Sequence, residues 1–354
     1  MKITLLVCFC VVGMITSFTG CTNVQENDRQ SHINNQTDEM KAEADIFAMD
    51  TYMKITAYGP EAEQAVQTAE QEVQRLDELL SAGNTQGEVG KINQNGGGTC
   101  SADTAYLLER SLALYQDTEG AFNVMLYPIM EAWGFINKAY AIPSEETLNQ
   151  LLPLTDITKV AYDSEQKEVK FMQEGMKIDF GGIAKGYTST KIMDIFEEYD
   201  IKSGVVNLGG NVQVKGKKVD GTDWRIGIQD PENQEAYLGV LEVHDKAVIT
   251  SGGYERYFEQ DGEVYHHILN PDTGKTANNG LISVTIVSED GALADGLSTS
   301  LFVMGKEKAE QYWQKHADKF QAILVTDDGE IYVTKGLTEQ FTPEAKTVHV
   351  IEKI

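Results

Sequence analysis

An aspartate and a threonine late in the chain carry the clearest chemical signal in the sequence. Asp295 and Thr299 are four positions apart at the start of an apolar run that ends at Met304. On a helix this spacing places both side chains on one face. A carboxylate and a hydroxyl on one face suit a hard cation such as magnesium, which prefers oxygen ligands and bridges phosphates. The alternative is a cap at the N-terminus of the helix, and the spacing alone favours that cap.

Two glycine-rich stretches could bring backbone amides close to a ligand. The first, residues 178–187, includes Gly182 and leads into a helix expected from Lys185 to about Tyr199. Glycine allows close approach, the N-terminus of a helix favours anions, and Lys185 adds a positive charge. The second stretch, residues 207–211, carries paired glycines at the end of a predicted strand. A turn is the plain alternative for both, and for the second stretch alone we prefer it.

Two later stretches combine small hydroxyl residues, aromatic residues and histidines. Thr250 and Ser251 precede two glycines and suit contacts with a phosphate or a ribose, although the aromatic residues that follow could form strand core. His266 and His267 precede a Pro-Asp-x-Gly turn. A histidine at this place can act as a general base near neutral pH. A single histidine is more often structural, so this interpretation depends on its neighbours.

Composition and incomplete motifs exclude several functions. The formal net charge of -26 opposes binding to nucleic acid, whose phosphates carry the same sign. Residues 274–276 end like a phosphate loop, but Leu269 occupies the position of the required first glycine. Ile249 breaks a nucleophile elbow in the same way. Cys100 is the only cysteine after residue 21, so the expected mature body has neither a disulfide framework nor a cysteine-based metal site.

The N-terminus carries an export signal. Lys2 precedes an almost wholly apolar run, residues 3–15, which is too short to span a bilayer comfortably. Residues 18–21 resemble a bacterial lipobox. We therefore expect residues 1–20 to be a signal peptide and Cys21 to receive a lipid anchor that includes palmitate, on the extracytoplasmic side of a membrane. The alternative is a plain secretory signal with an incidental cysteine.

Behind the anchor, the sequence divides into a polar tether and one folded body. Residues 21–45 lack periodicity and predict a flexible tether, so the body is expected at 46–354. Apolar residues from Ala62 to Leu80 step by four and three, which predicts an amphipathic helix. Without a regular βαβ alternation, the expected fold is α+β, with mixed sheets and packed helices. The other expected elements are strands at 51–58, 204–208, 224–229, 238–244, 282–288 and 322–326, a helix capped by Ser101, a helix at 185–199 and two helices within 292–316.

Taken in order, these stretches resemble the FAD:protein FMN transferase (ApbE) family. The resemblance covers nearly the whole body, from Met49 to Gly305. Each motif alone is weak, but their shared order is specific, and export as a lipoprotein is common in the family. The matching stretches are residues 49–51, 88–93, 120–122, 133–135, 179–186, 207–211, 250–258, 267–274 and 295–299.

The resemblance implies a reaction and its partners. Magnesium-bound FAD is cleaved at its diphosphate, FMN passes to a threonine of an acceptor protein through a phosphoester bond, and AMP leaves. This is phosphoryl transfer, in which positioning and charge neutralisation carry most of the catalysis. The implied acceptors carry FMN-binding domains of membrane redox complexes. Two alternatives stay open: a magnesium-dependent FAD pyrophosphatase that uses water as acceptor, and a lipoprotein that binds flavin without catalysis.

The resemblance also implies roles for individual residues. Asp295 and Thr299 would bind the magnesium by their side chains, and Gly182 by its carbonyl. Asp295 and His267 would be the catalytic residues, with His267 as a base or as the residue that positions the acceptor. The residues implied to line the FAD site are Met49, Ala121, Phe122, Asn123, Asp179, Lys185 and Ile268.

Several positions depart from the family pattern. Asn123 and Thr190 stand where the family usually has aspartate. Gly83 occupies the place of a frequent aromatic residue, and Gly296 replaces a common alanine. These departures concern the contact with FAD and leave the implied metal ligands intact.

Overall fold

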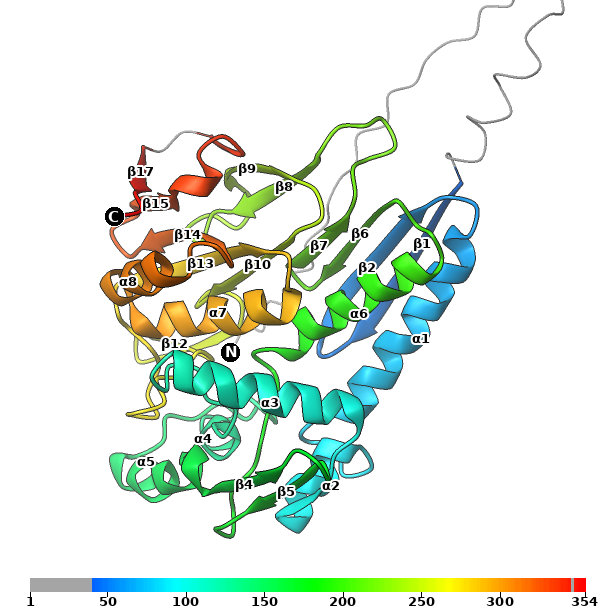
Figure 1. Ribbon diagram of the computed structural model, residues 1–354. Helices are drawn as coiled ribbons and strands as arrows, with labels where there is room; N and C mark the ends of the chain where they lie inside the picture. The colour runs from blue at the N-terminus through cyan, green and yellow to red at the C-terminus, as the bar shows by residue number, and fades with distance from the viewer. Residues whose placement is uncertain (1–39, 345–346) are drawn as a thin grey trace, which may run out of the picture.

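The computed structural model describes residues 40–344 and 347–354 (Figure 1). The expected signal peptide, Cys21 and most of the expected tether lie outside these residues. Within the described ranges, no helix is both long and apolar enough to cross a membrane.

The folded body begins earlier than the sequence pattern indicated. Strand β1 (Lys41–Ala48) pairs antiparallel with strand β2 (Thr51–Tyr58), so residues 41–45 belong to the sheet and the expected boundary at residue 46 is wrong. Ala42 and Ala44 of β1 are partly buried against the core. Alanines among charged residues give little hydrophobic contrast, so the alternation typical of a strand is weak in this segment.

In the described part of the chain, a nine-stranded sheet forms the centre of the body. Its order is β1-β2-β6-β7-β10-β13-β14-β15-β17, and every neighbouring pair is antiparallel except the parallel pair of β15 and β17. This mixed sheet with packed helices confirms the expected α+β class. The remaining strands of the sheet are β6 (Ser203–Leu208), β7 (Asn211–Lys215), β10 (Ala247–Gly252), β13 (Leu281–Ser288), β14 (Gln321–Thr326), β15 (Ile331–Thr334) and β17 (Val348–Ile351).

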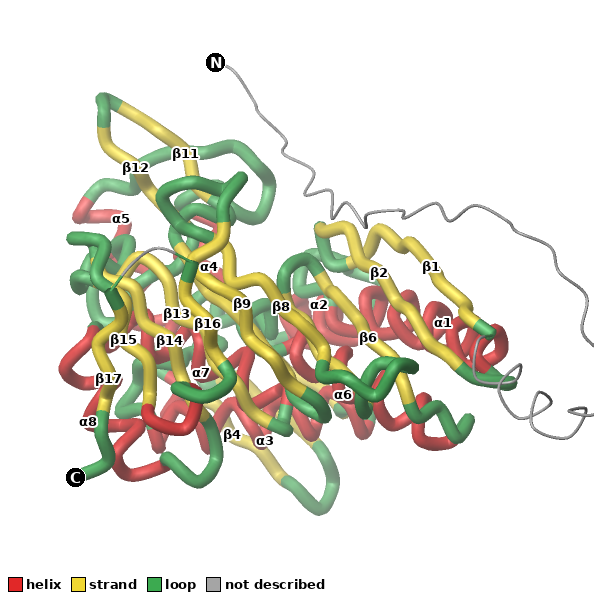
Figure 2. The backbone as a smooth tube through the Cα atoms, turned by 90° about the horizontal axis from the view of Figure 1, so that it is seen from above, coloured by secondary structure: helices red, strands yellow, loops and turns green. Residues whose placement is uncertain are grey.

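Helices cover one face of this sheet, and a small sheet covers part of the other (Figures 1 and 2). The small sheet has the order β16-β9-β8. Its residues Ile228, Leu241 and Phe341 share a buried cluster with Val248 and Ile323 of the large sheet. The covering elements are helices α1 (Ala62–Leu80), α6 (Ala184–Glu198), α7 (Gly291–Met304) and α8 (Lys306–His316), and strands β8 (Trp224–Gln229), β9 (Tyr237–Val243) and β16 (Phe341–Pro343).

Helix α1 confirms the apolar stripe expected from the sequence. The spacing of four and three places this stripe against β1, β2 and α6. The stripe is fully buried and consists of Ala62, Val66, Ala69, Val73, Leu76 and Leu80.

A third layer of helices and short strands lies beyond α6 and α7 (Figure 1). Helix α3 (Ala102–Asp117) begins as expected at Ser101, whose Oγ accepts a hydrogen bond from the backbone N–H of Thr104 at 3.4 Å. The sequence pattern did not indicate helix α2 (Glu88–Asn95), which is short. The other elements of this region are α4 (Tyr127–Ala132), α5 (Glu145–Leu151), β3 (Gly97–Thr99), β4 (Val160–Asp163), β5 (Glu168–Phe171) and the hairpin of β11 (Tyr257–Gln260) and β12 (Glu263–His266); three 3-10 turns lie at Leu152–Thr155, Ile157–Lys159 and Lys335–Leu337.

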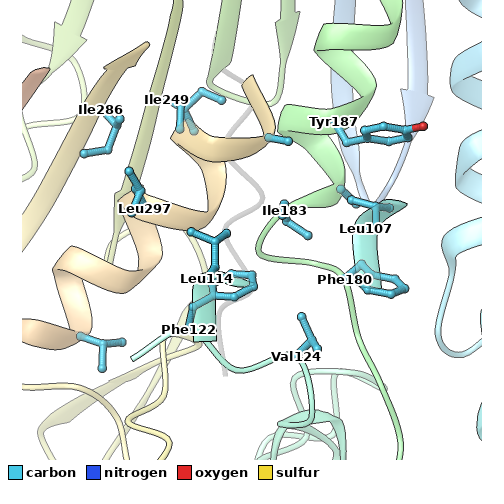
Figure 3. Close-up of a cluster of buried hydrophobic side chains, with 14 of the residues drawn as sticks. Leu107, Leu114, Phe122, Val124, Phe180, Ile183, Tyr187, Ile249, Ile286 and Leu297 are labelled. Atoms are coloured by element: carbon cyan, nitrogen blue, oxygen red, sulfur yellow. The ribbon is translucent and has the colours of Figure 1, made fainter. Parts of the chain in front are cut away.

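The core beneath the candidate site joins all three layers (Figure 3). Ile249 and Ile286 come from the large sheet, Leu297 from α7 and Leu114 from α3, and all four are buried in one cluster. Burial of each such side chain contributes about 1.5–3 kcal/mol. The site therefore rests on a packed support and not on free loops.

Candidate functional site

Asp295 lies inside helix α7 and does not cap it. The cap is Asp290, whose Oδ1 accepts the backbone N–H of Leu293 at 2.9 Å. Asp295 follows in the second turn and is only 4% exposed. The sequence-based preference for a capping role at Asp295 is therefore wrong, because the helix starts one turn earlier than that preference assumed.

The carboxylate of Asp295 is held by three neutral donors. The backbone N–H of Gly186 donates to Oδ2 at 2.8 Å, and Nδ2 of Asn211 donates to Oδ1 at 3.0 Å. The backbone N–H of Lys185 also donates to this carboxylate. Helix α6 begins without a side-chain cap at Ile183, so Asp295 satisfies the first-turn amides of that helix. The anion expected at this helix end is thus a residue of the chain itself.

Burial and charge oppose one another at Asp295. Burial raises the pKa of the carboxyl, and the nearby Lys185 charge and the donated hydrogen bonds act in the opposite direction. Within the described residues, the direct partners of Asp295 are neutral, so its charge lacks a contacting counter-ion. A buried carboxylate in this situation favours a bound cation.

Glycine at position 186 is a steric requirement of this arrangement. A Cβ on Gly186 would lie 2.1 Å from the carbonyl oxygen of Gly291 and 2.6 Å from Cβ of Asp295. A Cβ on Gly291 would in turn lie 2.5 Å from the carbonyl oxygen of Gly186. Only glycine at both positions lets α6 and α7 approach closely enough for Asp295 to reach the amides of α6.

Thr299 and Gly182 complete an oxygen-rich group beside Asp295. Thr299 is one helical turn beyond Asp295, and a Cβ on Gly182 would lie 3.8 Å from the Thr299 hydroxyl. The hydroxyl of Ser251 lies 3.3 Å from that of Thr299 and 2.8 Å from that of Ser298. The structure therefore brings the predicted metal ligands together and adds Ser251, which the sequence pattern had linked to phosphate contacts.

The chemistry of these donors fits magnesium. A carboxylate, a hydroxyl and a backbone carbonyl are all oxygen ligands, and magnesium commonly takes one or two carboxylates and completes its shell with water and substrate phosphates. Among the described residues, no group of three or more His, Cys, Asp or Glu side chains is arranged to hold a metal ion.

His267 is held as a neutral imidazole by the residue at the other end of its hairpin. The carbonyl oxygen of Arg256 accepts the backbone N–H of His267 at 3.0 Å and lies 3.2 Å from its Nδ1. Because a carbonyl can only accept, Nδ1 carries the hydrogen and Nε2 keeps a free lone pair. Burial, followed by the charges of Arg256 and Lys185, lowers the pKa of His267 to about 3.

His266 has a structural role. It is buried, its ring contacts Phe302 edge-on at 5.5 Å between centroids, and burial lowers its pKa. A Cβ on Gly253 would lie 2.8 Å from Cδ2 of His266, so the imidazole ring leaves no room for a larger residue at position 253. These contacts give His266 a structural role, and the preference for His267 as the chemically active histidine stays a prediction.

Two charged residues of the same hairpin were not predicted from the sequence. The interpretation of residues 250–258 rested on their hydroxyls and glycines. The structure adds two charges that act on the site, because Glu255 interacts with Asp295 and Arg256 interacts with His267. Although Glu255 is open to solvent, the surrounding protein and the charge of Asp295 raise its pKa to about 7. The adjacent opposite charges, Glu255 and Arg256, were the available signal in the sequence.

Met49 and Asp179, both expected to contact FAD, lie in constrained turns. Met49 adopts a left-handed backbone with φ of 49°, and its N–H donates to Oδ1 of Asp77 at 3.0 Å. The Oδ1 atom of Asp179 accepts the N–H of Gly181 at 2.9 Å, and burial raises the pKa of Asp179. Met49 follows the end of β1, Asp179 precedes the glycines at 181 and 182, and both residues are half-buried.

The other residues expected to line the FAD site differ in exposure. Phe122 and Ile268 are buried in the core, and Figure 3 shows Phe122 beside Leu114. The amide of Asn123 is used locally: Nδ2 donates to the Thr155 carbonyl at 3.0 Å, and Oδ1 accepts the Met125 N–H at 2.8 Å. FAD contacts by these residues stay predictions, as does one by the half-buried Ala121.

The family departures have local explanations. A Cβ on Gly296 would lie 2.5 Å from Cδ1 of Leu114, so the glycine makes room for that side chain. Thr190 donates to the carbonyl of Gly186 at 3.1 Å within α6. Gly83 lies near Tyr127, and a Cβ at this position would be 3.7 Å from the tyrosine hydroxyl.

Aromatic side chains form a wall next to His267. Phe258 stacks on Tyr265 at 5.3 Å and on Tyr140 at 5.1 Å between ring centroids. Phe135 contacts His267 edge-on at 6.4 Å. Nε1 of Trp133 donates to the carbonyl of Gly274 at 2.7 Å and ties this wall to the turn after His267. We call these residues, Trp133, Phe135, Tyr140, Phe258 and Tyr265, the aromatic wall.

A cavity of about 1040 Å³ lies apart from this site. It is lined by residues near the start of α7 and the end of α8, among them Arg110, Lys246 and Lys319. None of the residues expected to bind FAD or magnesium lines it. Arg110 bonds to Asp290, the cap of α7, at 2.6 Å, which indicates a structural role for this pair.

The fold and the site define a class of protein before any comparison. An oxygen donor set beside a neutral histidine and a lysine, on a mixed α+β frame, is suited to metal-assisted chemistry on a phosphate-bearing substrate. Comparison with known proteins gives the family. The sequence profile of the ApbE family matches residues 49–324, and the chain belongs to this family.

Similar proteins agree in sequence and in structure. The chain is 32% identical to the FAD:protein FMN transferase of Klebsiella pneumoniae over 284 residues, which cover 79% of this chain and 88% of that protein. It is 31% identical to that of Treponema pallidum over 312 residues, 82% and 86% of the two chains. The crystal structure of an ApbE protein from Thermotoga maritima superposes with a TM-score of 0.80 at 31% identity, covering 86% and 100%. The flavin transferase ApbE from Vibrio cholerae gives 0.77 at 26%, covering 85% and 99%.

Proposed function

We propose that the chain is a magnesium-dependent FAD:protein FMN transferase. It cleaves the diphosphate of FAD, attaches FMN through a phosphoester bond to a threonine of an acceptor protein, and releases AMP. The observation that carries this proposal is the buried carboxylate of Asp295, which lies one helical turn from the Thr299 hydroxyl and has neutral direct partners within the described residues. The names of the similar proteins support FAD as the substrate.

Asp295, Thr299 and the carbonyl of Gly182 would hold the magnesium ion. When bound, the ion would withdraw negative charge from the diphosphate of FAD and favour the departure of AMP. The chain itself keeps the donors in place, because Asn211 and the amides of α6 fix Asp295 while Ser251 contacts Thr299. Donors fixed in advance need little reorganisation during the reaction.

His267 would accept the proton of the attacking threonine hydroxyl; because its pKa is about 3, it would be neutral at neutral pH and would hold that proton only briefly. Its Nδ1–H is bound to the carbonyl of Arg256, so Nε2 is the free acceptor. Lys185 acts electrostatically on both His267 and Asp295, and its positive charge would offset the negative charge of the transferred phosphoryl group. The proton taken by Nε2 would then pass to solvent.

We also propose that the body is anchored to a membrane through a lipid on Cys21. Because Met40 already bonds to Gly59 and β1 starts at Lys41, the proposed tether would comprise residues 22–39, for which a random coil gives a reach of roughly 25 Å. That reach suits acceptors with FMN-binding domains in neighbouring membrane redox complexes. Incorporation of radiolabelled palmitate into the wild-type protein, and its loss in Cys21→Ala, tests the anchor; equal labelling of both would contradict it.

Incubation of the protein with FAD, magnesium and a purified FMN-binding domain of a membrane redox protein tests the proposed reaction. We expect covalent flavin fluorescence on the domain after denaturing electrophoresis, and release of AMP in equal amount. A domain whose acceptor threonine is replaced by valine should stay unlabelled. FMN and AMP without labelled domain would instead indicate the pyrophosphatase, and intact FAD would indicate the flavin carrier.

A further inference from the structure

Arg256 contacts the surroundings of His267 through both its backbone and its side chain. Its carbonyl oxygen accepts the backbone N–H of His267 at 3.0 Å and lies 3.2 Å from Nδ1 of the ring. One acceptor thus fixes the position of the residue and also the plane and tautomer of its imidazole. The backbone contact does not depend on the side chain at position 256.

The guanidinium of Arg256 reaches across to the aromatic wall. Its Nη2 donates to the carbonyl oxygen of Phe135 at 2.9 Å. The ring of Phe135 in turn contacts His267 edge-on, with centroids 6.4 Å apart. The side chain therefore fixes the aromatic surface against which the imidazole packs, on a segment more than one hundred residues away in the sequence.

We infer that Arg256 is a positioning residue for His267, an inference that rests on the proposed function. The carbonyl of Arg256 holds Nδ1–H, and its guanidinium holds Phe135 against the ring, so that Nε2 points in one direction. A base must be placed within a few tenths of an ångström of the proton that it accepts, and a misplacement of about 1 Å costs about 100-fold in rate.

The charge of Arg256 gives the proposed contact a readout that is separate from its effect on the rate. The charged or titratable groups that act on His267 are Arg256, His266 and Lys185, and all three disfavour its protonated form. Arg256 also acts on the carboxyls of Asp179 and Glu255 and favours their ionised forms. Removal of the guanidinium should therefore raise the pKa of His267, while burial keeps that pKa below its ordinary value.

A phosphate clamp is the competing role for Arg256, because guanidinium groups bind phosphates well. The two roles predict different kinetics. A clamp contributes to FAD binding, so its loss raises the KM for FAD. A positioning residue acts on the base, so its loss lowers kcat and shifts the protonation of His267.

The experiment uses Arg256→Gln and Arg256→Lys in the full chain, with Arg225→Gln as the matched control. Arg225 lies on β8, is well exposed and pairs with Glu242 at 3.5 Å, away from the site. The measurements are kcat and KM for FAD in transfer to the purified FMN-binding domain, and the NMR titration of the His267 imidazole without FAD, assigned with His267→Gln. The titration does not require transferase activity.

For Arg256→Gln we expect kcat to fall roughly 10- to 100-fold with the KM for FAD within about twofold of wild type. We also expect a higher pKa of His267, and Arg256→Lys should restore a low pKa and part of kcat. An unchanged His267 pKa, or a raised KM with normal kcat, would overturn the positioning role. Absence of transfer by the wild-type protein would overturn the proposed function instead, and the titration would still decide whether Arg256 governs His267.

Discussion

Asp295 serves the fold and the proposed chemistry with the same two oxygens. It takes the place of a capping residue for α6, although it lies more than one hundred residues further along the chain. Each oxygen receives at least one hydrogen bond from the protein and has a further lone pair available. A substitution of Asp295 therefore disturbs the start of α6 as well as the proposed magnesium site. A substitution of a residue that bonds to Asp295 can affect the proposed magnesium site and leave the start of α6 intact.

Asn211 offers that separation. In Asn211→Ala the carboxylate of Asp295 keeps the amides of α6 but loses the bond to Oδ1 at 3.0 Å. Because residues that orient metal ligands typically contribute 10- to 100-fold to metal affinity, we expect roughly tenfold more magnesium to be needed for half-maximal activity. Magnesium titration of the transfer rate measures this. Asn207→Ala, at the other end of the same glycine turn, serves as the control, and an equal effect of both variants would contradict the role of Asn211.

Glu255 should make FAD binding depend on pH. Its pKa is raised to about 7, so it is mostly neutral below that pH and negative above it. In its negative form Glu255 would offset the positive charge of Lys185 and repel the FAD diphosphate, so we expect FAD affinity to fall as the pH rises from about 6 to about 8. Quenching of flavin fluorescence at both pH values measures this affinity. Glu255→Gln should bind FAD equally well at both, and a slope as steep as that of wild type would refute the assignment.

At the scale of elements, the contact between α6 and α7 determines the site. The two helices touch through Gly186 and Gly291, where any side chain would meet backbone oxygen at 2.1 or 2.5 Å. Gly186→Ala should push the helices apart and cost about 1–3 kcal/mol in the free energy of unfolding. Chemical denaturation measures the loss, and magnesium-dependent activity should fall with it. Gly83→Ala is the control, because its Cβ would meet only the Tyr127 hydroxyl at 3.7 Å; equal stability of both variants would rule out the steric argument.

The sequence predicted elements better than it predicted contacts between them. The stripe of α1, the cap at Ser101 and the shared face of Asp295 and Thr299 follow from local spacing, and the structure confirms them. The bond of Asn211 to Asp295 joins residues 84 positions apart, and that of Arg256 to Phe135 joins residues 121 apart. Local patterns contain no information on such pairs, so only the resemblance to a family could indicate which stretches meet.

At the scale of the whole molecule, the N-terminal edge of the sheet can be tested by truncation. Residues 41–45 pair with residues 54–58, so a chain that starts at residue 46 loses the outer half of β1. We expect this chain to have a lower Tm than one that starts at residue 40, because β2 loses hydrogen bonds and Ala42 and Ala44 no longer cover the core. Calorimetry of the two chains measures the difference. Equal Tm values would show that residues 41–45 add no stability to the sheet.

The order of strands in the large sheet has a consequence for how the chain folds. Strand β2 pairs with β6, so that Met53 faces Leu208, and the N-terminal hairpin cannot join the sheet until most of the chain between them is present. Pairing over such separations is slow, because the entropy of closing the loop is lost before the contacts form. During this interval the edge of β2 that later pairs with β6 is open to other chains, although α1 can already cover its apolar face. If the chain is exported as proposed above, that edge must be kept from other chains until β6 arrives.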